Sequence, residues 1–335
     1  MKLTVLGPGC WGLTLAWLLS DNFDEVCVWG REQDISEELR LHKKCSKPLS
    51  VTLQDKVEIT SNLEKALENA DIIFLVIATS GIRAVSKQIA KIGLKNNQIL
   101  VNLSKGLELN TLMRMSEVIG EELPNANIAV LSGPTLAKEV LSGLPTLACV
   151  ASKNIEIAKK VQELCSVPNR FRLYTNPDVI GVELGGSLKN VIAIASGFAD
   201  AMGLGDNLRG ALLTRGMAEI VRISLALGAN PSTLYGLSGM GDLIATCSSP
   251  MSRNFTVGSM IGKGKKIDDI LKELGSVAEG VQTLKAVCDL AKKLNIDAPV
   301  SNAIYEAVYT DITPAQVVEK LMTRKLKSED FYNFQ

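Results

Sequence analysis

This chain of 335 residues has little histidine, few aromatic residues and no excess of charge of either sign. His42 is the only histidine, and because it stands in a polar segment we expect a solvated side chain. With one histidine, a Ser-His-Asp triad or a histidine-based metal centre is not expected, and proton transfer must use another residue type. Aromatic residues make up 4%, and Lys+Arg and Asp+Glu both number 36. Neither a base-stacking surface nor a basic field is present, so we expect no nucleic-acid partner.

Paired cysteines and long apolar runs are also missing. The seven cysteines are odd in number and form no C-x-x-C pair, which argues against a disulfide framework and a zinc site, so no metal is expected. Reduced thiols are typical of the cytosol. We expect no segment to approach the roughly 20 apolar residues that span a bilayer. Met1 and Lys2 lead directly into a short apolar run, so no signal peptide is expected. We expect a soluble, cytoplasmic protein without membrane insertion.

What is present is an alternation of apolar runs and amphipathic stretches. Runs rich in Val, Ile and Leu predict strands at 3–6, 25–29, 71–79, 98–104, 127–132 and 146–151. Amphipathic segments at 61–70 and 81–93 predict helices between them. This βαβ alternation is typical of a doubly wound, mainly parallel sheet in an α/β fold.

The pattern changes to helices in the second half. Asn176 and Pro177 resemble an N-cap followed by proline at the first helical position. Helices are then predicted at 177–201, 207–228, 254–262, 267–274, 281–294, 300–309 and 314–323. Because the chain is too long for one core, we predict an α/β domain over residues 1–176 and an all-α C-terminal domain over residues 177–335.

A glycine-rich turn follows the first predicted strand. The segment reads GPGCWG over residues 7–12 and opens a helix, which is the context of a dinucleotide-binding fingerprint in a Rossmann-like domain. Gly7 permits the tight turn, Gly9 lets the backbone approach a pyrophosphate, and Gly12 allows close packing of helix on sheet. The N–H groups of Cys10 and Trp11 then face the phosphates.

The end of the second predicted strand bears on the choice of coenzyme. An NAD-selective site usually has an acidic residue here, whereas this chain has Gly30 and Arg31. The guanidinium of Arg31 suits the 2′-phosphate of NADP or the face of the adenine, with a solvated arginine as the alternative. We therefore expect NADP or NAD to bind, with NADPH at least as good as NADH.

Five further segments indicate a family. They read NLSKGLE (102–108), SGPTLAKE (132–139), ELGGSLKNVIAIASG (183–197), GLSGMGDLIATCSSPMSRNFTVG (236–258) and VAEGV (277–281). Together with GPGCWG, they make the chain resemble the bacterial-type NAD(P)-dependent glycerol-3-phosphate dehydrogenases. In the phosphate loop this chain has Pro8 and Cys10 where the family commonly has Ala and Ser.

The resemblance implies an oxidoreductase that interconverts dihydroxyacetone phosphate and sn-glycerol 3-phosphate, a precursor of glycerophospholipids. Lys189 occupies the position of the family's proton donor and acceptor, and such a group is needed because a hydroxyl proton moves as hydride is transferred. Lys105 would polarise the substrate oxygen or act as a neighbouring cation. Asp242 would contact the substrate and orient Lys189, with Thr246 one helical turn further on, and Asn190 would position the substrate.

The remaining expected contacts concern the substrate phosphate and the coenzyme. A helix start that carries an arginine suits a phosphate, which assigns Ser252, Arg253 and Asn254 to the substrate. Gly185 and Gly186 are expected to permit close approach of their helix to the coenzyme or the sheet. By resemblance, further substrate contacts come from Gly133 and Thr135, and coenzyme contacts from Lys105, Ala137, Arg253, Val277 and Glu279.

Two alternatives remain at the level of the sequence. A dehydrogenase of the same architecture acting on another hydroxy acid would not be expected to carry the SPMSRN segment. A regulatory dinucleotide sensor would need neither Lys189 nor Asp242. The helical half lacks a heptad seam, so the expected homodimer rests on the resemblance alone.

Overall fold

The computed structural model describes residues 1–274, 279–326 and 328–329. The chain forms two compact units, residues 1–183 and 184–335. The first contains the strands, and the described residues of the second form helices, so the predicted order of an α/β domain followed by a helical one is found. Along the chain, the division between the units falls within one long helix, whereas the predicted boundary after residue 176 precedes that helix.

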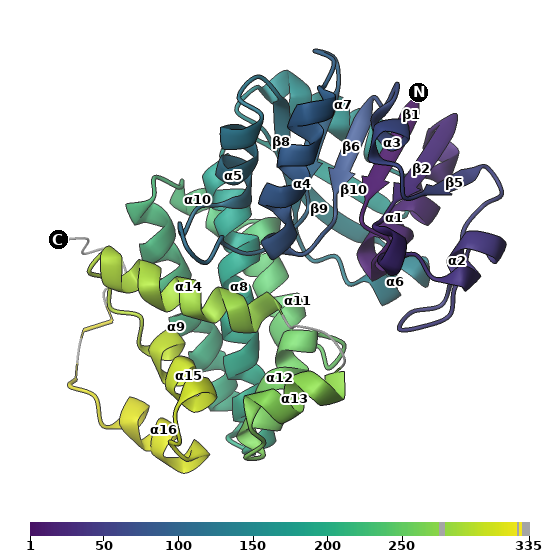
Figure 1. Ribbon diagram of the computed structural model, residues 1–335. Coiled ribbons are helices and arrows are strands. Elements are labelled where there is room, and N and C mark those ends of the chain that lie inside the picture. The colour runs from purple at the N-terminus through teal and green to yellow at the C-terminus, as the bar shows by residue number, and fades with distance from the viewer. Residues whose placement is uncertain (275–278, 327, 330–335) are drawn as a thin grey trace. The chain divides into compact units, whose positions relative to one another are not determined.

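The first unit is built on an eight-stranded sheet, and the structure describes every residue of this unit (Figure 1). The strands are β1 (Lys2–Leu6), β2 (Glu25–Trp29), β5 (Val57–Thr60), β6 (Ile72–Leu75), β7 (Ile99–Asn102), β8 (Asn127–Ser132), β9 (Thr146–Ala151) and β10 (Phe171–Asn176). Their order is β10-β9-β8-β7-β6-β1-β2-β5. All neighbours are parallel except β8 and β9. A separate ribbon pairs β3 (Lys44–Cys45) with β4 (Val51–Thr52).

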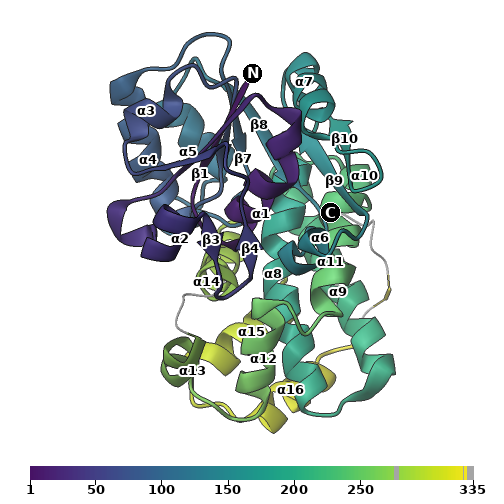
Figure 2. The same ribbon diagram turned by 90° about the vertical axis from the view of Figure 1, so that its right-hand side faces the viewer.

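Helices cover both faces of this sheet (Figure 2). Side chains of α1 (Cys10–Leu19), α6 (Ala137–Leu141) and α7 (Ile155–Cys165) share one buried cluster with Phe74 and alternate strand residues. A second cluster joins Leu75 to the opposite set of helices, α3 (Leu63–Leu67), α4 (Thr79–Ile92) and α5 (Met115–Glu122). Successive strand residues point to opposite faces, so burial on both faces requires continuous apolar runs. The remaining pieces are α2 (Glu37–His42) and the short 3-10 turns η1 (Ser20–Asn22) and η2 (Glu32–Asp34).

Two strands of the sheet were not predicted, and both lie at its edges. β10 alternates buried and exposed residues, and β5 has only one fully buried residue, so neither shows the continuous apolar run of the central strands. The strands predicted at 71–79 and 98–104 are shorter, ending at Leu75 and Asn102, because the residues beyond them form loops and a helix start.

The second unit consists of helices. They are α8 (Val179–Ala201, which begins in the first unit), α9 (Gly205–Ala226), α10 (Pro231–Leu234), the π-helical turn η3 (Leu237–Gly241), α11 (Asp242–Cys247), α12 (Arg253–Gly262), α13 (Ile267–Leu274), α14 (Glu279–Lys293), α15 (Pro299–Tyr309) and α16 (Pro314–Met322). The predicted cap of the first helix was wrong by two positions. Asn176 accepts a hydrogen bond from the N–H of Asp178, and Asp178 in turn caps α8 by accepting from Gly181.

Helix α8 is the apolar centre of this part of the chain. It is long and apolar enough to span a bilayer, contrary to the expectation that no segment is, but 94% of its most apolar stretch is buried inside the protein. It therefore has the character of a core helix. Glycines allow α12 to approach it closely, since a side-chain carbon at Gly197 or Gly258 would lie 1.9 Å from a backbone oxygen of the other helix.

The positions of the single histidine and of the cysteines bear on the expected absence of metal sites and disulfides. His42 is exposed in the last turn of α2, as expected. All seven cysteines lie among the described residues and are free thiols. Among the residues that the structure describes, no cluster of His, Cys, Asp and Glu has a geometry able to hold a metal ion.

Candidate active site

The carboxyl ends of neighbouring parallel strands line one edge of the sheet in the first unit. The register aligns the last residues of β1, β2, β6 and β7, namely Leu6, Trp29, Leu75 and Asn102. Ligands of open α/β sheets bind outside this edge. The predicted coenzyme residues Gly7 and Arg31 and the predicted substrate residue Lys105 all follow these strand ends.

The glycine turn between β1 and α1 has the geometry that its spacing predicted. Gly7 has φ of +125°, and a side-chain carbon there would lie 2.3 Å from the carbonyl oxygen of Val76. At Gly12 the same carbon would lie 2.0 Å from the carbonyl oxygen of Gly7. Gly9, the N-cap of α1, has no atom within 4 Å of that position. The turn is thus tight on the protein side and open beside Gly9.

The start of α1 fits an anionic ligand. Cys10 and Trp11 form its first turn, which contains no acidic residue, so the N–H groups and helix dipole face no competing carboxylate of their own helix. The ring of Trp11 is fixed by an edge contact with Phe171, with centroids 6.5 Å apart. These features suit the pyrophosphate of a dinucleotide.

Arg31 lies in the loop after β2, but its guanidinium has a partner that the sequence interpretation did not consider. Nε and Nη2 donate to the two carboxylate oxygens of Asp34 at 2.6 and 2.9 Å. The arginine side chain is 64% exposed. The end of β2 therefore presents a cation and an anion together, although the expectation was a cation alone.

Gly30 is in close contact with the phosphate loop. A side-chain carbon at this position would lie 2.6 Å from Cγ of Pro8 and 2.9 Å from Cδ. Because a proline ring moves little, only glycine fits here while Pro8 is present. The turn after β2 and the glycine turn after β1 are therefore matched in shape.

Three of the predicted substrate residues meet after β7 and β8. Nζ of Lys105 donates to the carbonyl oxygen of Gly133 at 3.0 Å, and the same oxygen accepts from Oγ1 of Thr135 at 3.2 Å. Gly133 has φ of +149°, and a side-chain carbon there would lie 2.9 Å from Cα of Ala148. Ala137, expected beside the coenzyme, is the first residue of the short helix α6.

A buried carboxylate near the start of α8 was missed by the sequence interpretation. Glu183, whose side chain is 1% exposed, accepts from Nη1 of Arg114 at 3.0 Å and from the N–H and hydroxyl of Ser116 at 2.8 and 2.6 Å. Burial raises the pKa of Glu183, while Arg114 and Ser116 act in the opposite direction. This carboxylate ties the first turns of α5 and α8 together. Its place in the ELGG segment was the one available signal.

Lys189, Asp242 and Thr246 form a connected polar group inside the second unit. Nζ of Lys189 lies 2.8 Å from Oδ1 of Asp242 and donates to Oγ1 of Thr246, which itself donates to Asp242 at 3.2 Å. The side chain of Asp242 is 2% exposed. α11 begins at Asp242, so Thr246 lies one turn along the same helix face. Beside them, burial raises the pKa of Cys247 to about 12, which keeps this thiol protonated and inert.

The start of α12 carries the residues expected at the substrate phosphate. Ser252 is the N-cap, and its hydroxyl accepts from the N–H of Phe255. Arg253 is exposed in the first turn, which contains no acidic residue. Asn254 has a second task, because its Oδ1 accepts from the N–H of Gly280 at 3.1 Å, in the first turn of α14. Only its amide N–H₂ is then left to donate to a phosphate.

The other predicted residues of the second unit lie around these two sites. Asn190 is buried on α8, and its backbone oxygen faces Gly280. Glu279 is the first residue of α14, whereas Val277 lies outside the described residues. Gly185 does allow a close approach between backbones. The neighbouring segment within its own unit is Ser238 and Gly239, whose backbone atoms lie 2.8 and 3.0 Å from the position that a side-chain carbon on residue 185 would take.

Comparison with known proteins matches both halves of the chain. The family model for the NAD-dependent glycerol-3-phosphate dehydrogenase N-terminus matches residues 2–158, and the model for the C-terminus of the same enzymes matches residues 178–319. A glycerol-3-phosphate dehydrogenase [NAD(P)+] of Listeria monocytogenes is 45% identical over 332 residues, which is 98% of each chain. The protein of that name from Bacillus subtilis is 42% identical over 96% of this chain and 94% of its own.

A solved structure agrees with these matches. The crystal structure of glycerol-3-phosphate dehydrogenase from Coxiella burnetii is 33% identical, covers 96% of this chain and 99% of its own, and superposes with a TM-score of 0.91. The predicted fold class is thereby confirmed. Since the two family models match residues 2–158 and 178–319, most of the chain, the chain belongs to the NAD-dependent glycerol-3-phosphate dehydrogenase family.

Proposed function

We propose that this protein reversibly reduces dihydroxyacetone phosphate to sn-glycerol 3-phosphate with NADH or NADPH, and that Lys189 is the proton donor and acceptor. The observation that carries the role of Lys189 is its buried contact with Asp242 and Thr246. A lysine on a solvated helix face would have no such setting. Family membership supports the substrate pair.

The residues of the second unit suit the proton transfer. The reduced nicotinamide, when bound, supplies the hydride that reduces the carbonyl carbon. The ammonium of Lys189 donates a proton to the carbonyl oxygen, and the carboxylate of Asp242 stabilises the ammonium form in a site with little water. Thr246 holds both groups in one orientation. In the oxidative direction the neutral amine takes the hydroxyl proton back.

Other residues bind the charged parts of the ligands. Arg253 and the first N–H groups of α12 would bind the substrate phosphate, together with the amide of Asn254. Lys105, held beside Gly133 and Thr135, would polarise the carbonyl oxygen. The glycine turn and the start of α1 would hold the pyrophosphate.

For the coenzyme, we propose that both forms work and that NADPH is at least as good as NADH. Arg31 would donate to the 2′-phosphate of NADP. Asp34, paired with it, would accept from the ribose hydroxyls of NAD in the way that an acidic residue usually does. The joint presence of both charges supports dual use.

Two further proposals rest on the family resemblance and the composition. We propose that the enzyme acts in the cytoplasm as a homodimer and supplies glycerol 3-phosphate for phospholipid synthesis. Balanced charge and free thiols are compatible with this location. Light scattering on the purified protein gives the oligomeric state directly, and a monomeric mass would contradict the dimer.

The function is tested by the absorbance of the reduced nicotinamide. Purified protein should oxidise NADH or NADPH when dihydroxyacetone phosphate is added, without added metal. Equal efficiency with unphosphorylated dihydroxyacetone would contradict the phosphate site, and loss of activity to a chelator would contradict metal-free chemistry. Turnover of other hydroxy or keto acids alone would indicate a different dehydrogenase, and binding without turnover would indicate a sensor.

A further inference from the structure

The segment between β7 and α5, residues 103–114, carries Lys105 and is held firmly before that residue. Ser104 donates from its hydroxyl to the carbonyl oxygen of Ile77 and from its N–H to Oδ1 of Asn102 at 3.2 Å. Nδ2 of Asn102 returns a bond to the carbonyl oxygen of Ser104 at 3.1 Å. The backbone is therefore fixed on the strand side of Lys105.

On the other side of Lys105 the chain makes a closed turn. The N–H of Glu108 donates to the carbonyl oxygen of Met113 at 3.0 Å, and the N–H of Leu112 donates back to Glu108 at 2.8 Å. Leu107 and Arg114 form a single β-bridge at its base. Leu112 has φ of +61°, an unfavourable value for a residue with a γ-branched side chain. Such a turn needs contacts from outside to keep one conformation.

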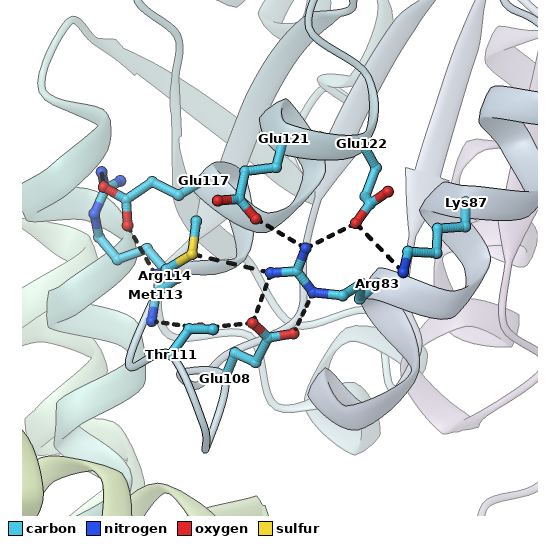
Figure 3. Close-up of polar contacts among 9 residues, drawn as sticks. All are labelled: Arg83, Lys87, Glu108, Thr111, Met113, Arg114, Glu117, Glu121 and Glu122. Carbon is cyan, nitrogen blue, oxygen red and sulfur yellow. Dashed lines mark hydrogen bonds and ion pairs between the residues drawn. The ribbon is translucent and has the colours of Figure 1, made fainter.

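Arg83 on α4 provides those contacts (Figure 3). Its Nε and Nη2 donate to the two carboxylate oxygens of Glu108 at 2.8 and 2.7 Å, a bidentate pair of fixed geometry. Thr111, within the turn, donates to the same carboxylate at 2.6 Å. The guanidinium of Arg83 thus holds the turn in place through the carboxylate of Glu108.

The same guanidinium also binds the end of α5. Nη1 of Arg83 donates to Glu121 at 2.8 Å and to Glu122 at 2.7 Å. These two contacts join α4 to α5 (Figure 3). The two helices already pack through buried side chains that include Ile82, Ile89 and Ile119. The contacts of Arg83 that reach the loop are the ion pair with Glu108 and a weaker hydrogen bond from Nη2 to Sδ of Met113 at 3.9 Å (Figure 3). The two kinds of contact on one arginine can therefore be separated by mutation.

We propose that Arg83 is a positioning residue of the enzyme: its ion pair with Glu108 fixes the turn after Lys105 and so keeps the Lys105 ammonium at the carbonyl oxygen of Gly133. This inference rests on the proposed function, in which Lys105 contacts the substrate. Lysine has a long, flexible side chain, so its head group is placed accurately only if its backbone is rigid. A misplacement of about 1 Å in such a group can lower the rate by up to about 10²-fold.

The test compares two carboxylates on the same guanidinium. Glu108→Gln weakens the contact to the loop, and Glu121→Gln, the matched control, weakens a contact to α5 alone. We expect Glu108→Gln to lower kcat/KM for dihydroxyacetone phosphate by roughly 10-fold or more and Glu121→Gln to leave it within about twofold of the parent. Arg83→Met should resemble Glu108→Gln, and Arg83→Lys, which keeps the charge but not the fork, should restore only part of the loss.

A second readout does not depend on turnover. The acylation rate of the Lys105 amine, measured by mass spectrometry, should rise in Glu108→Gln and stay at the parent value in Glu121→Gln, with exposed Lys153 as the internal reference. A purely structural role would lower the melting temperature of both variants, with kcat/KM and Lys105 labelling equal in the two. That result would overturn the proposal.

Lys105→Met separates this inference from the function on which it rests. If Lys105→Met is impaired and Glu108→Gln behaves like Glu121→Gln, positioning by Arg83 is wrong and the role of Lys105 stands. If Lys105→Met keeps parental kinetics, the role of Lys105 is wrong and positioning by Arg83 falls with it. Impairment of both Lys105→Met and Glu108→Gln, with Glu121→Gln unaffected, supports both.

Discussion

The Nζ atom of Lys189, on α8, lies 2.8 Å from Oδ1 of Asp242, the first residue of α11. Both side chains are almost fully buried. Neither charge is therefore solvated by bulk water, and each is stabilised by the opposite charge of the other. This mutual dependence means that a substitution of either residue has a chemical effect and a structural one, and experiments must separate the two.

Replacement of Lys189 by methionine keeps the apolar stem and removes the proton donor. We expect kcat to fall by roughly 10²–10⁴-fold, with coenzyme binding, measured by fluorescence quenching, little changed. Asp242 is left buried without its cation, which should cost about 3–5 kcal/mol of stability. The double variant Lys189→Met/Asp242→Asn should regain stability in thermal denaturation but no activity. A kcat within a few-fold of the parent would make Lys105 the candidate donor.

Replacement of Arg253 by alanine tests the phosphate site at the start of α12. Charge-assisted hydrogen bonds to the substrate phosphate are lost, so kcat/KM for dihydroxyacetone phosphate should fall roughly 10- to 100-fold. The helix start remains, and added phosphite or sulfate should partly restore turnover of the unphosphorylated substrate. Lys263→Ala, at the other end of α12, is the control. Unchanged KM and kcat would rule out the contact.

Gly30→Ala tests the close fit between the loop after β2 and the phosphate loop. The added carbon would lie 2.6 Å from Cγ of Pro8, an overlap of the kind that costs about 1–3 kcal/mol in packed sites. We expect weaker binding of both coenzymes. Pro8→Ala in the same chain should remove most of the loss, because the ring atoms are gone. Equal losses in the single and double variants would show that Gly30 acts in another way.

The pair of Arg31 and Asp34 gives a two-sided test of coenzyme choice. Arg31→Ala should weaken NADPH more than about tenfold and NADH less, because a 2′-phosphate accepts charge-assisted hydrogen bonds. Asp34→Asn should shift the ratio of kcat/KM towards NADPH, since it removes a carboxylate that engages Nε and Nη2 and would repel the phosphate. Equal losses for both coenzymes in Arg31→Ala would mean that Arg31 only supports the adenine.

The ion pair of Arg83 and Glu108 predicts a dependence of stability on pH. Arg83 lowers the pKa of Glu108 in the folded protein. The pair therefore stabilises the fold above the pKa of an unperturbed glutamate, about 4.3, and this contribution is lost as the pH falls through the lowered value. The difference in melting temperature between the parent and Glu108→Gln should be largest near neutral pH and vanish in acid. A difference that stays constant down to about pH 3 would contradict the ionic origin.

Much of the fold could be predicted from the sequence because its signals are local. The apolar runs of the central strands, the helices of the second half and the roles of Gly7 and Gly12 depend on neighbours in the chain and on backbone geometry. The edge strands β5 and β10 were missed because a strand covered on fewer sides needs no continuous apolar run. Asp34, three residues after Arg31, was within reach of the sequence analysis, yet its pairing was not considered.

The sequence by itself determined which chemical groups this protein has: one histidine, a glycine fingerprint, and the motifs that carry Lys189, Lys105 and Arg253. Only the tertiary structure decided most of their contacts. The resemblance implies that Asp242 orients Lys189, but the contacts of Asn254 with Gly280 and of Glu108 with Arg83 came only from the structure. Partners of this kind are chosen by the packing of distant helices, which bury a charge only where an opposite charge or a donor meets it, and no local pattern in the chain encodes that choice.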